Sequence, residues 1–251
     1  LADSYQAAVG YFTGAKVLGV TATSDRADRR NLGSYFESLA YEYSLLEAIR
    51  DGWLAKLRAL SIPLPIDISK VGLSGGDFKA SDIDDALAPY MDQIATEMAE
   101  HCRDRKTLVF VPLVATAERF AAVLAAKGFR AAWVSGDHED RAGILKRYAA
   151  GEYDVLVNSM LLTEGYDDPA TDCIVCLRPT KSRGLYAQII GRGTRICEGK
   201  KDLLLLDFLW MTDKHELCRP ASLVADSEAM ARAMKKMTEE ATAVRAKKPV
   251  E

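Results

Sequence analysis

The sequence predicts an α/β fold in which helices cover both faces of a parallel β-sheet. Strand and helix patterns alternate through the second half of the chain, as in right-handed β-α-β units. Three strand patterns are near-continuous apolar runs, which are typical of parallel strands buried on both faces. These runs are residues 154–158, 173–177 and 203–206. Gly128 and Gly151 stand where helix C-caps belong and support the predicted helix ends.

The sequence predicts fewer helices and strands in the N-terminal part of the chain. Residues 4–12 are expected to form a short helix, and Lys16–Thr21 a buried strand. Residues 38–60 predict a strand, then a helix, then a connection that contains Trp53. The polar stretch between these segments predicts no regular element.

Prolines and glycines between Ser61 and Ala80 predict a linker or an insertion. Within it, Gly72-Leu73-Ser74-Gly75-Gly76 fits the G-x-S-x-G pattern of a hydrolase nucleophile elbow. That pattern functions where a strand leads directly into a helix, and Asp77–Ala80 separate the serine from the next predicted helix. A turn is the favoured interpretation, and a serine hydrolase is an alternative.

A long helix is predicted from Asp82 to Arg103, where Ser81 and Asp84 resemble a capping box. Its apolar residues recur at helical spacing, so one face is expected to join the core. The following elements are expected at 107–111, 115–127, 131–135, 138–150, 154–158, 173–177, 183–194 and 203–208. Residues 227–247 predict a further, alanine-rich charged helix.

Composition limits the kind of protein this is. The 251 residues carry a formal net charge of −3, which excludes a generally basic, histone-like binder. Any nucleic-acid contact must therefore come from a local basic groove. No apolar run reaches the roughly 18 residues of a membrane span, so we expect no membrane. The chain begins with Leu1, which predicts a fragment or a processed product.

The five cysteines are odd in number and do not suggest a disulfide framework, so a reducing cytoplasm is expected. Cys173-x-x-Cys176 has the separation of half a zinc site, but no second pair completes it. An offset of three in a strand points the two thiols to opposite faces. Both cysteines are therefore predicted to be core residues, and no metal site is predicted.

On the helix predicted over 183–194, Gln188, Arg192 and Arg195 are spaced at i, i+4 and i+7, which places one amide and two guanidinium groups on a single face. Guanidinium groups bind phosphate oxygens bidentately and do not lose their charge. Ligands of open α/β sheets bind beyond the carboxyl ends of the strands. We expect the segment after Asn158 and the helix after Pro179 to lie there, and the spacing predicts an anion site.

The same residues resemble a known family. Thr163-Glu164-Gly165-x-Asp167-x-Pro169 and Gln188-x-x-Gly191-Arg192-Gly193-x-Arg195 look like motifs V and VI of superfamily 2 helicases. Residues 18–23 and 107–112 resemble motifs III and IV, in family order. The resemblance is closest to the restriction-type and repair-type DNA helicases.

The resemblance implies a RecA-like fold of the P-loop NTPase type and a division of the chain. Residues 1–37 would be a remnant of the first, ATP-binding RecA-like domain, and 38–80 a connection. Residues 81–215 would be the second RecA-like domain and 216–251 a helical extension. The sequence contains no G-x-x-x-x-G-K-[ST] phosphate loop, so we expect this chain alone to be inactive.

The family's roles transfer to specific positions. Arg195 would be the arginine finger and Arg192 a second phosphate contact, with Gln188 near the nucleotide; these three are the predicted catalytic residues. Gly165 and Asp167 complete the predicted ATP site. The motif V contact to nucleic acid would be Thr163, and small loop residues at strand ends would let phosphates approach. The other residues predicted to bind nucleic acid are Pro112, Leu113, Ser135 and Gly136.

Thr21, Ala22 and Thr23 would couple nucleotide state to strand movement in an intact motor. The sequence thus predicts part of an ATP-dependent helicase or translocase, with DNA favoured over RNA as the partner. ATP and Mg²⁺ would be held mainly by a first RecA-like domain outside this chain. The alternative is a non-catalytic nucleic-acid-binding or scaffold module that reuses the fold.

Overall fold

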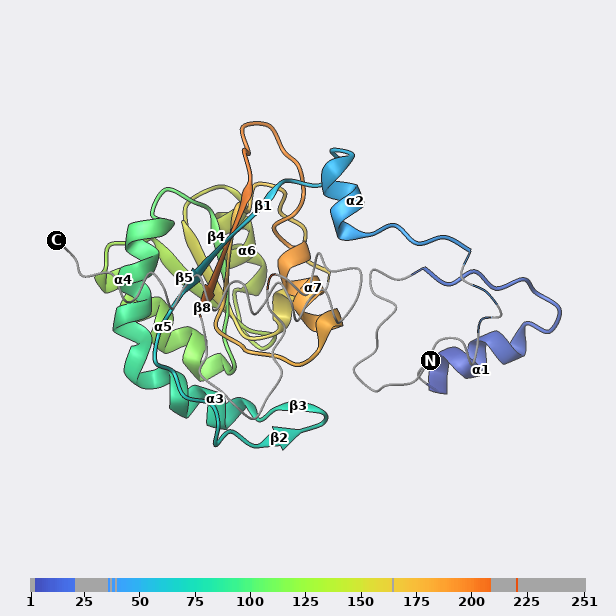
Figure 1. Cartoon of the computed structure of the whole chain (residues 1–251), viewed down its shortest axis with the longest axis horizontal. Coiled ribbons are helices and arrows are strands. Elements are labelled where there is room, and N and C mark those ends of the chain that lie inside the picture. The colour runs from blue at the N-terminus through green and yellow to red at the C-terminus, as the bar shows by residue number, and fades with distance from the viewer. Residues whose placement is uncertain are drawn as a thin grey trace.

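The computed structural model describes residues 3–20, 36, 38, 40–163, 165–208 and 220. A six-stranded sheet in the order β1-β8-β7-β4-β6-β5 lies at its centre, and each neighbouring pair is parallel (Figure 1). The strands are β1 (Leu57–Ile62), β4 (Thr107–Phe110), β5 (Ala131–Val134), β6 (Val155–Asn158), β7 (Cys173–Cys176) and β8 (Leu203–Phe208). The predicted parallel α/β architecture is confirmed.

Helices cover both faces of this sheet. One face carries α3 (Ala80–Leu87), α4 (Met91–His101) and α5 (Val114–Ala126), and the other carries α6 (Arg141–Ala149) and α7 (Arg183–Gly191). Figure 1 shows α4 and α5 on one side of the strands and α7 on the other. The strand order explains this, because right-handed connections that step in opposite directions along a sheet place their helices on opposite faces.

Strand residues alternate between the two layers of the core. Cys173 and Val175 pack with the α3–α5 layer, whereas Ile174 and Cys176 pack with the α6–α7 layer. All four side chains are at most 4% exposed. The prediction that Cys173 and Cys176 are core residues on opposite faces is therefore confirmed, and the two thiols cannot share one ion.

The long helix predicted from Asp82 to Arg103 is interrupted. Between α3 and α4 the chain forms a short 3₁₀ helix, η2 (Ala88–Tyr90), that contains Pro89. Proline lacks the backbone N–H that a continuous helix needs. The predicted capping box is also wrong, because Lys79 is the N-cap of α3 and the Asp84 carboxylate accepts hydrogen bonds from α5.

Part of the expected connection belongs to the sheet and its core. β1 is the edge strand beside β8, and the residues after it return to the core, where Leu64, Ile66 and Ile68 are at most 3% exposed. A two-stranded antiparallel hairpin of β2 (Leu73–Ser74) and β3 (Asp77–Phe78) follows. Ser74 lies in this exposed hairpin and not at a strand-to-helix turn, so the hydrolase alternative lacks its structural context.

The N-terminal segment differs from its prediction in one respect. Helix α1 (Asp3–Tyr11) is confirmed, but residues 15–20 form no strand, and Val17, Leu18 and Val20 are 49%, 81% and 90% exposed. Apolar side chains alone do not form a strand that has no neighbour to pair with. The predicted coupling residues Thr21, Ala22 and Thr23 lie outside the described residues, as does the predicted helix 227–247.

Helix α2 (Leu45–Arg50) follows the N-terminal segment and is capped by Ser44. The Ser44 side chain accepts from the Glu47 backbone N–H, and the Glu47 carboxylate accepts from the Ser44 backbone N–H. No strand precedes it among residues 40–44, contrary to expectation. Within the described residues, no helix is long and apolar enough to cross a membrane.

Candidate functional site

Three loops that carry predicted nucleic-acid contacts lie at one edge of the sheet. Pro112 and Leu113 follow β4, Ser135 and Gly136 follow β5, and Thr163 follows β6. Because β5, β6 and β4 are parallel neighbours, their carboxyl ends meet at the same edge. We call this the carboxyl edge. It brings these five residues onto neighbouring loops although they are far apart in sequence.

The residues of this edge differ in their exposure to solvent. Gly136 is exposed and Leu113 half-buried, whereas Pro112 and Ser135 are buried. Thr163 is 6% exposed, and its hydroxyl donates to the Met160 carbonyl oxygen at 2.6 Å. That bond fixes the short 3₁₀ turn η3 (Leu161–Thr163) after β6. Thr163 therefore shapes the loop, and Gly136 presents its backbone to solvent.

The predicted row of Gln188, Arg192 and Arg195 is not formed on one helix. Helix α7 ends at Gly191, Arg192 is its C-cap, and Arg195 lies beyond it in irregular chain. The helix runs opposite to the strands, so its end lies at the amino ends of β1 and β8. There the Thr194 carbonyl accepts from the Ala55 N–H at 2.8 Å.

The expectation that these arginines lie beyond the carboxyl edge is therefore wrong. Close packing explains the glycine between them. A Cβ on Gly193 would lie 2.4 Å from Leu203 Cδ1 and 3.0 Å from Ile174 Cγ1, at the start of β8 and β7. Only a glycine lets the turn approach the strands this closely. The arginines are thus held against the sheet near its amino edge.

Two contacts join this turn to the loop between β6 and β7. In the first, Arg192 Nη1 donates to the Tyr166 carbonyl at 2.6 Å. The Nε of Arg192 also donates within its own helix, to the Gln188 carbonyl at 3.5 Å. Arg195 Nε lies 3.6 Å from Asp167 Oδ1, and both side chains are just over half exposed, at 55% and 56%. Gly165 begins this loop segment with a φ of 70°, a conformation that favours glycine.

The arrangement brings together Gly165, Asp167, Gln188, Arg192 and Arg195, the five residues predicted to bind nucleotide. Arg192 is half-buried and bonded to the main chain, so it orders the loop. Arg195 is exposed, and within the part of the chain that the structure describes it pairs with the solvent-accessible carboxylate of Asp167, at a distance longer than a hydrogen bond. A guanidinium in that state is free to exchange its partner for a phosphate.

Asp168 has a different environment from its neighbour Asp167. It is 8% exposed, and its carboxylate lies 2.7 Å from Lys106 Nζ, just before β4. Asp168 also accepts the Ala170 N–H at 3.2 Å. It therefore anchors the β6–β7 loop to the sheet, and Asp167 is the acid that faces solvent.

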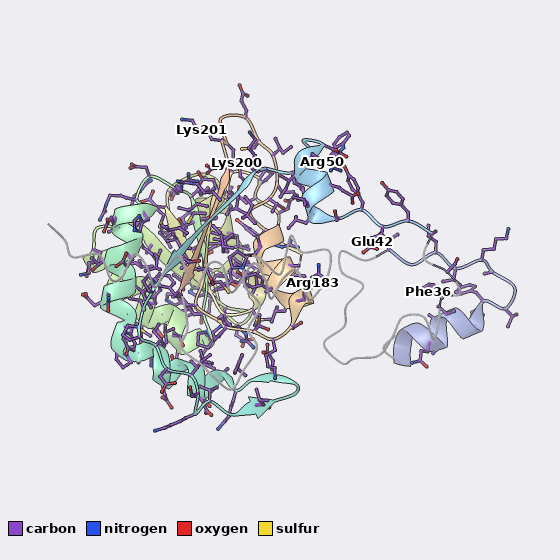
Figure 2. The ribbon with its side chains drawn as sticks, viewed as in Figure 1. Phe36, Glu42, Arg50, Arg183, Lys200 and Lys201 are labelled. Carbon is purple, nitrogen blue, oxygen red and sulfur yellow. The ribbon has the colours of Figure 1, made fainter. Side chains whose placement is uncertain are left out.

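Sequence reasoning missed Lys200, which joins the two motif segments. Its ammonium donates to the carbonyls of Pro169 at 3.0 Å, Thr171 at 2.5 Å and Gly193 at 2.7 Å. Burial lowers the pKa of Lys200, but three acceptors match the three N–H groups of the charged form. Lys200 lies beside exposed Lys201 on the loop before β8 (Figure 2). No sequence pattern marks such a lysine.

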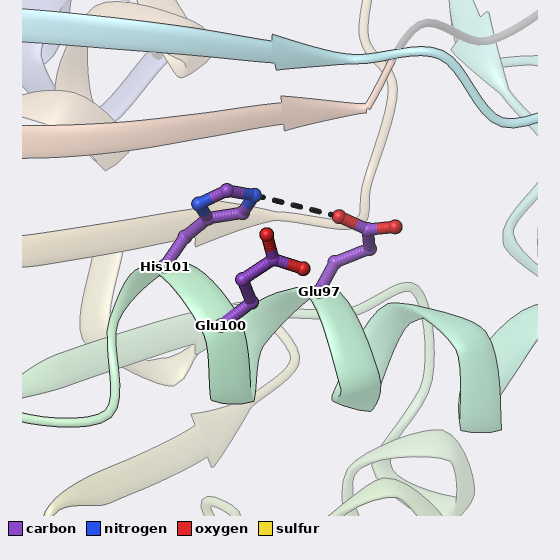
Figure 3. Close-up of side chains that lie close together, drawn as sticks. All are labelled: Glu97, Glu100 and His101. Atoms are coloured by element: carbon purple, nitrogen blue, oxygen red, sulfur yellow. Dashed lines mark ion pairs between the residues drawn. The ribbon is translucent and has the colours of Figure 1, made fainter. Parts of the chain in front are cut away.

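A second polar group lies on α4, where Glu97, Glu100 and His101 present ligand-type atoms within 4.8 Å of one another (Figure 3). Glu97 and His101 are four residues apart on the helix, and His101 Nε2 lies 3.5 Å from Glu97 Oε2. Helical spacing and this pair account for the grouping.

Comparisons with known proteins agree with this architecture. Residues 90–197 match the model of the helicase conserved C-terminal domain. The chain is 30% identical over 222 residues to a putative ATP-dependent helicase IRC3 of Saccharomyces cerevisiae, covering 83% of this chain and 32% of that protein. It is 33% identical over 196 residues to the putative mitochondrial ATP-dependent helicase irc3 of Schizosaccharomyces pombe, covering 76% and 32%.

A solved fragment of a putative HsdR subunit of a type I restriction enzyme from Vibrio vulnificus YJ016 is similar in structure. Its TM-score is 0.67 at 29% identity, covering 82% of this chain and 42% of that one. The chain thus spans about a third of the length of its two yeast relatives. The matched domain, these relatives and the parallel sheet identify the chain as carrying the C-terminal, RecA-like domain of the superfamily 2 helicases.

Proposed function

We propose that this chain is the part of an ATP-dependent helicase or translocase that supplies the arginine finger and half of the nucleic-acid groove. The observation that carries the proposal is the exposed pair of Arg195 and Asp167, which lies beyond α7 beside half-buried hydrogen bonds of Arg192 and Lys200. A catalytic arginine must be exposed enough to reach a ligand and fixed enough to be aimed.

Each residue of the site then has a task. Arg195 stabilises negative charge that develops on the transferred phosphoryl group, and Arg192 orders the loop beside it as the second cation. Gln188, Gly165 and Asp167 orient groups near the nucleotide. ATP with Mg²⁺ would supply the phosphoryl chemistry, bound mainly by the first RecA-like domain of the longer protein. The N-terminal segment, with exposed Leu18 and Val20, would continue into that domain.

The carboxyl edge is proposed to follow a nucleic-acid backbone. Main-chain groups at strand ends contact phosphates without reading bases, and Gly136 leaves room for such an approach. DNA is favoured over RNA, because the Vibrio relative is named a restriction-enzyme subunit. The cytoplasm stays a prediction, since the Schizosaccharomyces pombe relative is named mitochondrial.

The test is Arg195→Ala in the longer protein that contains this chain. We expect nucleic-acid-stimulated ATP hydrolysis to fall by about 10³- to 10⁵-fold, the usual contribution of an arginine finger. Nucleotide affinity should change much less, because the charge it stabilises appears only in the transition state. Arg195→Lys should restore little, since an ammonium lacks the planar fork.

Arg147→Ala is the matched control. Arg147 on α6 also forms an arginine–aspartate pair, with its Nη2 2.7 Å from Oδ2 of Asp140 at the N-cap of that helix, and its side chain is 41% exposed. We expect it to leave turnover unchanged. Near-normal turnover by Arg195→Ala would refute the catalytic role and favour the non-catalytic nucleic-acid-binding or scaffold module.

A further inference from the structure

The β2–β3 hairpin is attached to the carboxyl edge by specific contacts. Asp77 Oδ2 accepts from Thr180 Oγ1 at 2.6 Å, and Asp77 Oδ1 accepts from the Lys181 N–H at 3.0 Å. Both partners lie in the loop between β7 and α7. In the same loop, Arg178 Nη1 donates to the Pro112 carbonyl at 3.3 Å. The hairpin is therefore continuous with the candidate nucleic-acid loops.

The base of the hairpin is fixed while its tip is open. Phe78 is buried in the core at 5% exposure, and the Gly72 N–H donates to Asp82 Oδ2 at 3.1 Å. The two strands are joined by Gly75 and Gly76, both with positive φ and both exposed. A fixed base aims the tip, so the hairpin can hold a ligand beside the edge without first becoming ordered.

Most exposed large hydrophobic side chains of the described residues lie before residue 54, but two lie near the carboxyl edge. Among the described residues from 57 to 208, the exposed large hydrophobic side chains are Leu73, Val114 and Ile196. Leu73 lies on the hairpin and is 50% exposed, and Val114 opens α5 directly after Leu113 and is 43% exposed. Two of the three thus lie at the carboxyl edge, beside loops that offer small residues and main-chain donors.

Positive charge lies next to the hairpin. Lys181 is exposed, and its backbone is the group that Asp77 holds. Arg183 is also exposed and opens α7, at the end remote from Lys200 and Lys201 (Figure 2). The Asp77 carboxylate at the hairpin accepts hydrogen bonds from Thr180 Oγ1 and from the Lys181 N–H with its two oxygens. The surface beside the hairpin therefore combines cations with an apolar side chain.

We propose that the β2–β3 hairpin and the Thr180–Arg183 turn extend the nucleic-acid groove and bind a single strand, with Lys181 and Arg183 on its phosphates and Leu73 against a base. This rests on the proposed function, in which the carboxyl edge binds nucleic acid. A single strand fits better than a duplex, because its base faces are accessible to an apolar side chain whereas those of a duplex are stacked.

The experiment measures binding of this chain to a fluorescent single-stranded oligothymidylate, an RNA of matched length and a duplex, across a salt series. Lys181→Gln should weaken single-strand binding about fivefold near 0.1 M salt and lower the log–log salt slope by about 0.7, the loss of one phosphate contact. Leu73→Asp should weaken it, and Leu73→Phe should preserve or strengthen it. Lys201→Gln, the same charge change at the amino edge, should match the unaltered chain.

The outcomes separate the two proposals. If the unaltered chain binds none of the three nucleic acids, the carboxyl edge is not a nucleic-acid surface, and the hairpin inference fails with it. If Gly136→Asp weakens binding while the Lys181 and Leu73 variants behave like Lys201→Gln, the edge stands and the hairpin inference is overturned. Equal losses for duplex and single strand in Leu73→Asp would overturn the base contact. Melting temperatures of all variants check that each is folded.

Discussion

Asp167 and Asp168 are adjacent in sequence but have different roles in the structure. Asp168 is buried against Lys106 and holds the β6–β7 loop on the sheet, whereas Asp167 faces solvent beside Arg195. An exposed pair such as Arg195 and Asp167 contributes little to stability, so its geometry can serve a ligand. A buried charge has to keep its partner, because losing it leaves an unpaired ion.

Lys200 offers a test at the scale of one residue. We expect Lys200→Met to lower the free energy of unfolding by about 1–3 kcal/mol, because three carbonyl oxygens lose their donor in a half-buried site. Lys201→Met removes an exposed ammonium one residue away and should change stability by no more than about 0.5 kcal/mol. Urea denaturation of this chain measures both, and equal values would show that the three hydrogen bonds contribute nothing.

Gly191 and Gly193, on either side of Arg192, give a second test, of close packing against the sheet. Gly193→Ala should destabilise the chain by about 1–3 kcal/mol, because its Cβ would overlap Leu203 and force the core to shift. A Cβ on Gly191 has no atom within 4 Å, so Gly191→Ala should be neutral or slightly stabilising in the last turn of α7. Thermal unfolding compares the two, and a stable Gly193→Ala variant would refute close packing as the reason for this glycine.

At the scale of elements, the break at Pro89 changes what Asp84 does. In α3 its carboxylate accepts from Thr116 Oγ1 at 2.6 Å and from Arg119 Nη2, both on α5. Asp84 is 8% exposed, so these hydrogen bonds join α3 to α5 at a site that is largely shielded from water. In the same layer, Asp92 of α4 pairs with Lys127 at the C-cap of α5, but the Asp92 side chain is 78% exposed.

The buried contacts of Asp84 and the exposed pair of Asp92 predict different losses of stability when each aspartate is replaced. Asp84→Asn should lower the free energy of unfolding by about 1.5–3 kcal/mol, because hydrogen bonds to a buried charge are among the stronger ones. Asp92→Asn should change it by at most about 1 kcal/mol, since water screens that pair. Denaturant titration of the two variants gives the comparison. A cost for Asp92→Asn as large as that for Asp84→Asn would contradict the argument from burial.

At the scale of the whole molecule, the two candidate surfaces lie at opposite edges of one sheet. The loops proposed to bind nucleic acid are at the carboxyl edge, and Arg192 and Arg195 are near the amino edge. Helix α7 spans the distance between them, since it begins beside the hairpin and ends at Arg192. Tyr186, Ile189 and Ile190 pack this helix on the sheet, so its two ends are held at fixed positions relative to each other.

The purified chain should show no ATP hydrolysis, because its 251 residues contain no phosphate loop to hold the nucleotide phosphates. It should still bind nucleic acid weakly, with a steep salt dependence and no sequence preference, since only part of a groove is present. Phosphate release with and without single-stranded DNA checks the first expectation. Turnover that Arg195→Ala abolishes would show that this chain is a complete catalytic unit.

The sequence by itself determined the alternating strands and helices of residues 107–208 and the two layers of their core. The apolar runs at 154–158, 173–177 and 203–206 are strands, and the three-residue offset sends Cys173 and Cys176 to opposite faces. These inferences succeed because strand and helix periods are local properties of the chain. Motif residues could also be identified from the sequence, since their order and spacing are written in it.

Only the tertiary structure decided where those residues lie and what they contact. Helix α7 ends at Gly191, so Arg195 does not lie on it. Because α7 runs opposite to the strands, the residues after it lie at the amino edge of the sheet. The contacts of Lys200 and the attachment of Asp77 to Thr180 join segments distant in sequence. Such contacts depend on strand order, on the direction of each connection and on close packing, which no local pattern of residues records.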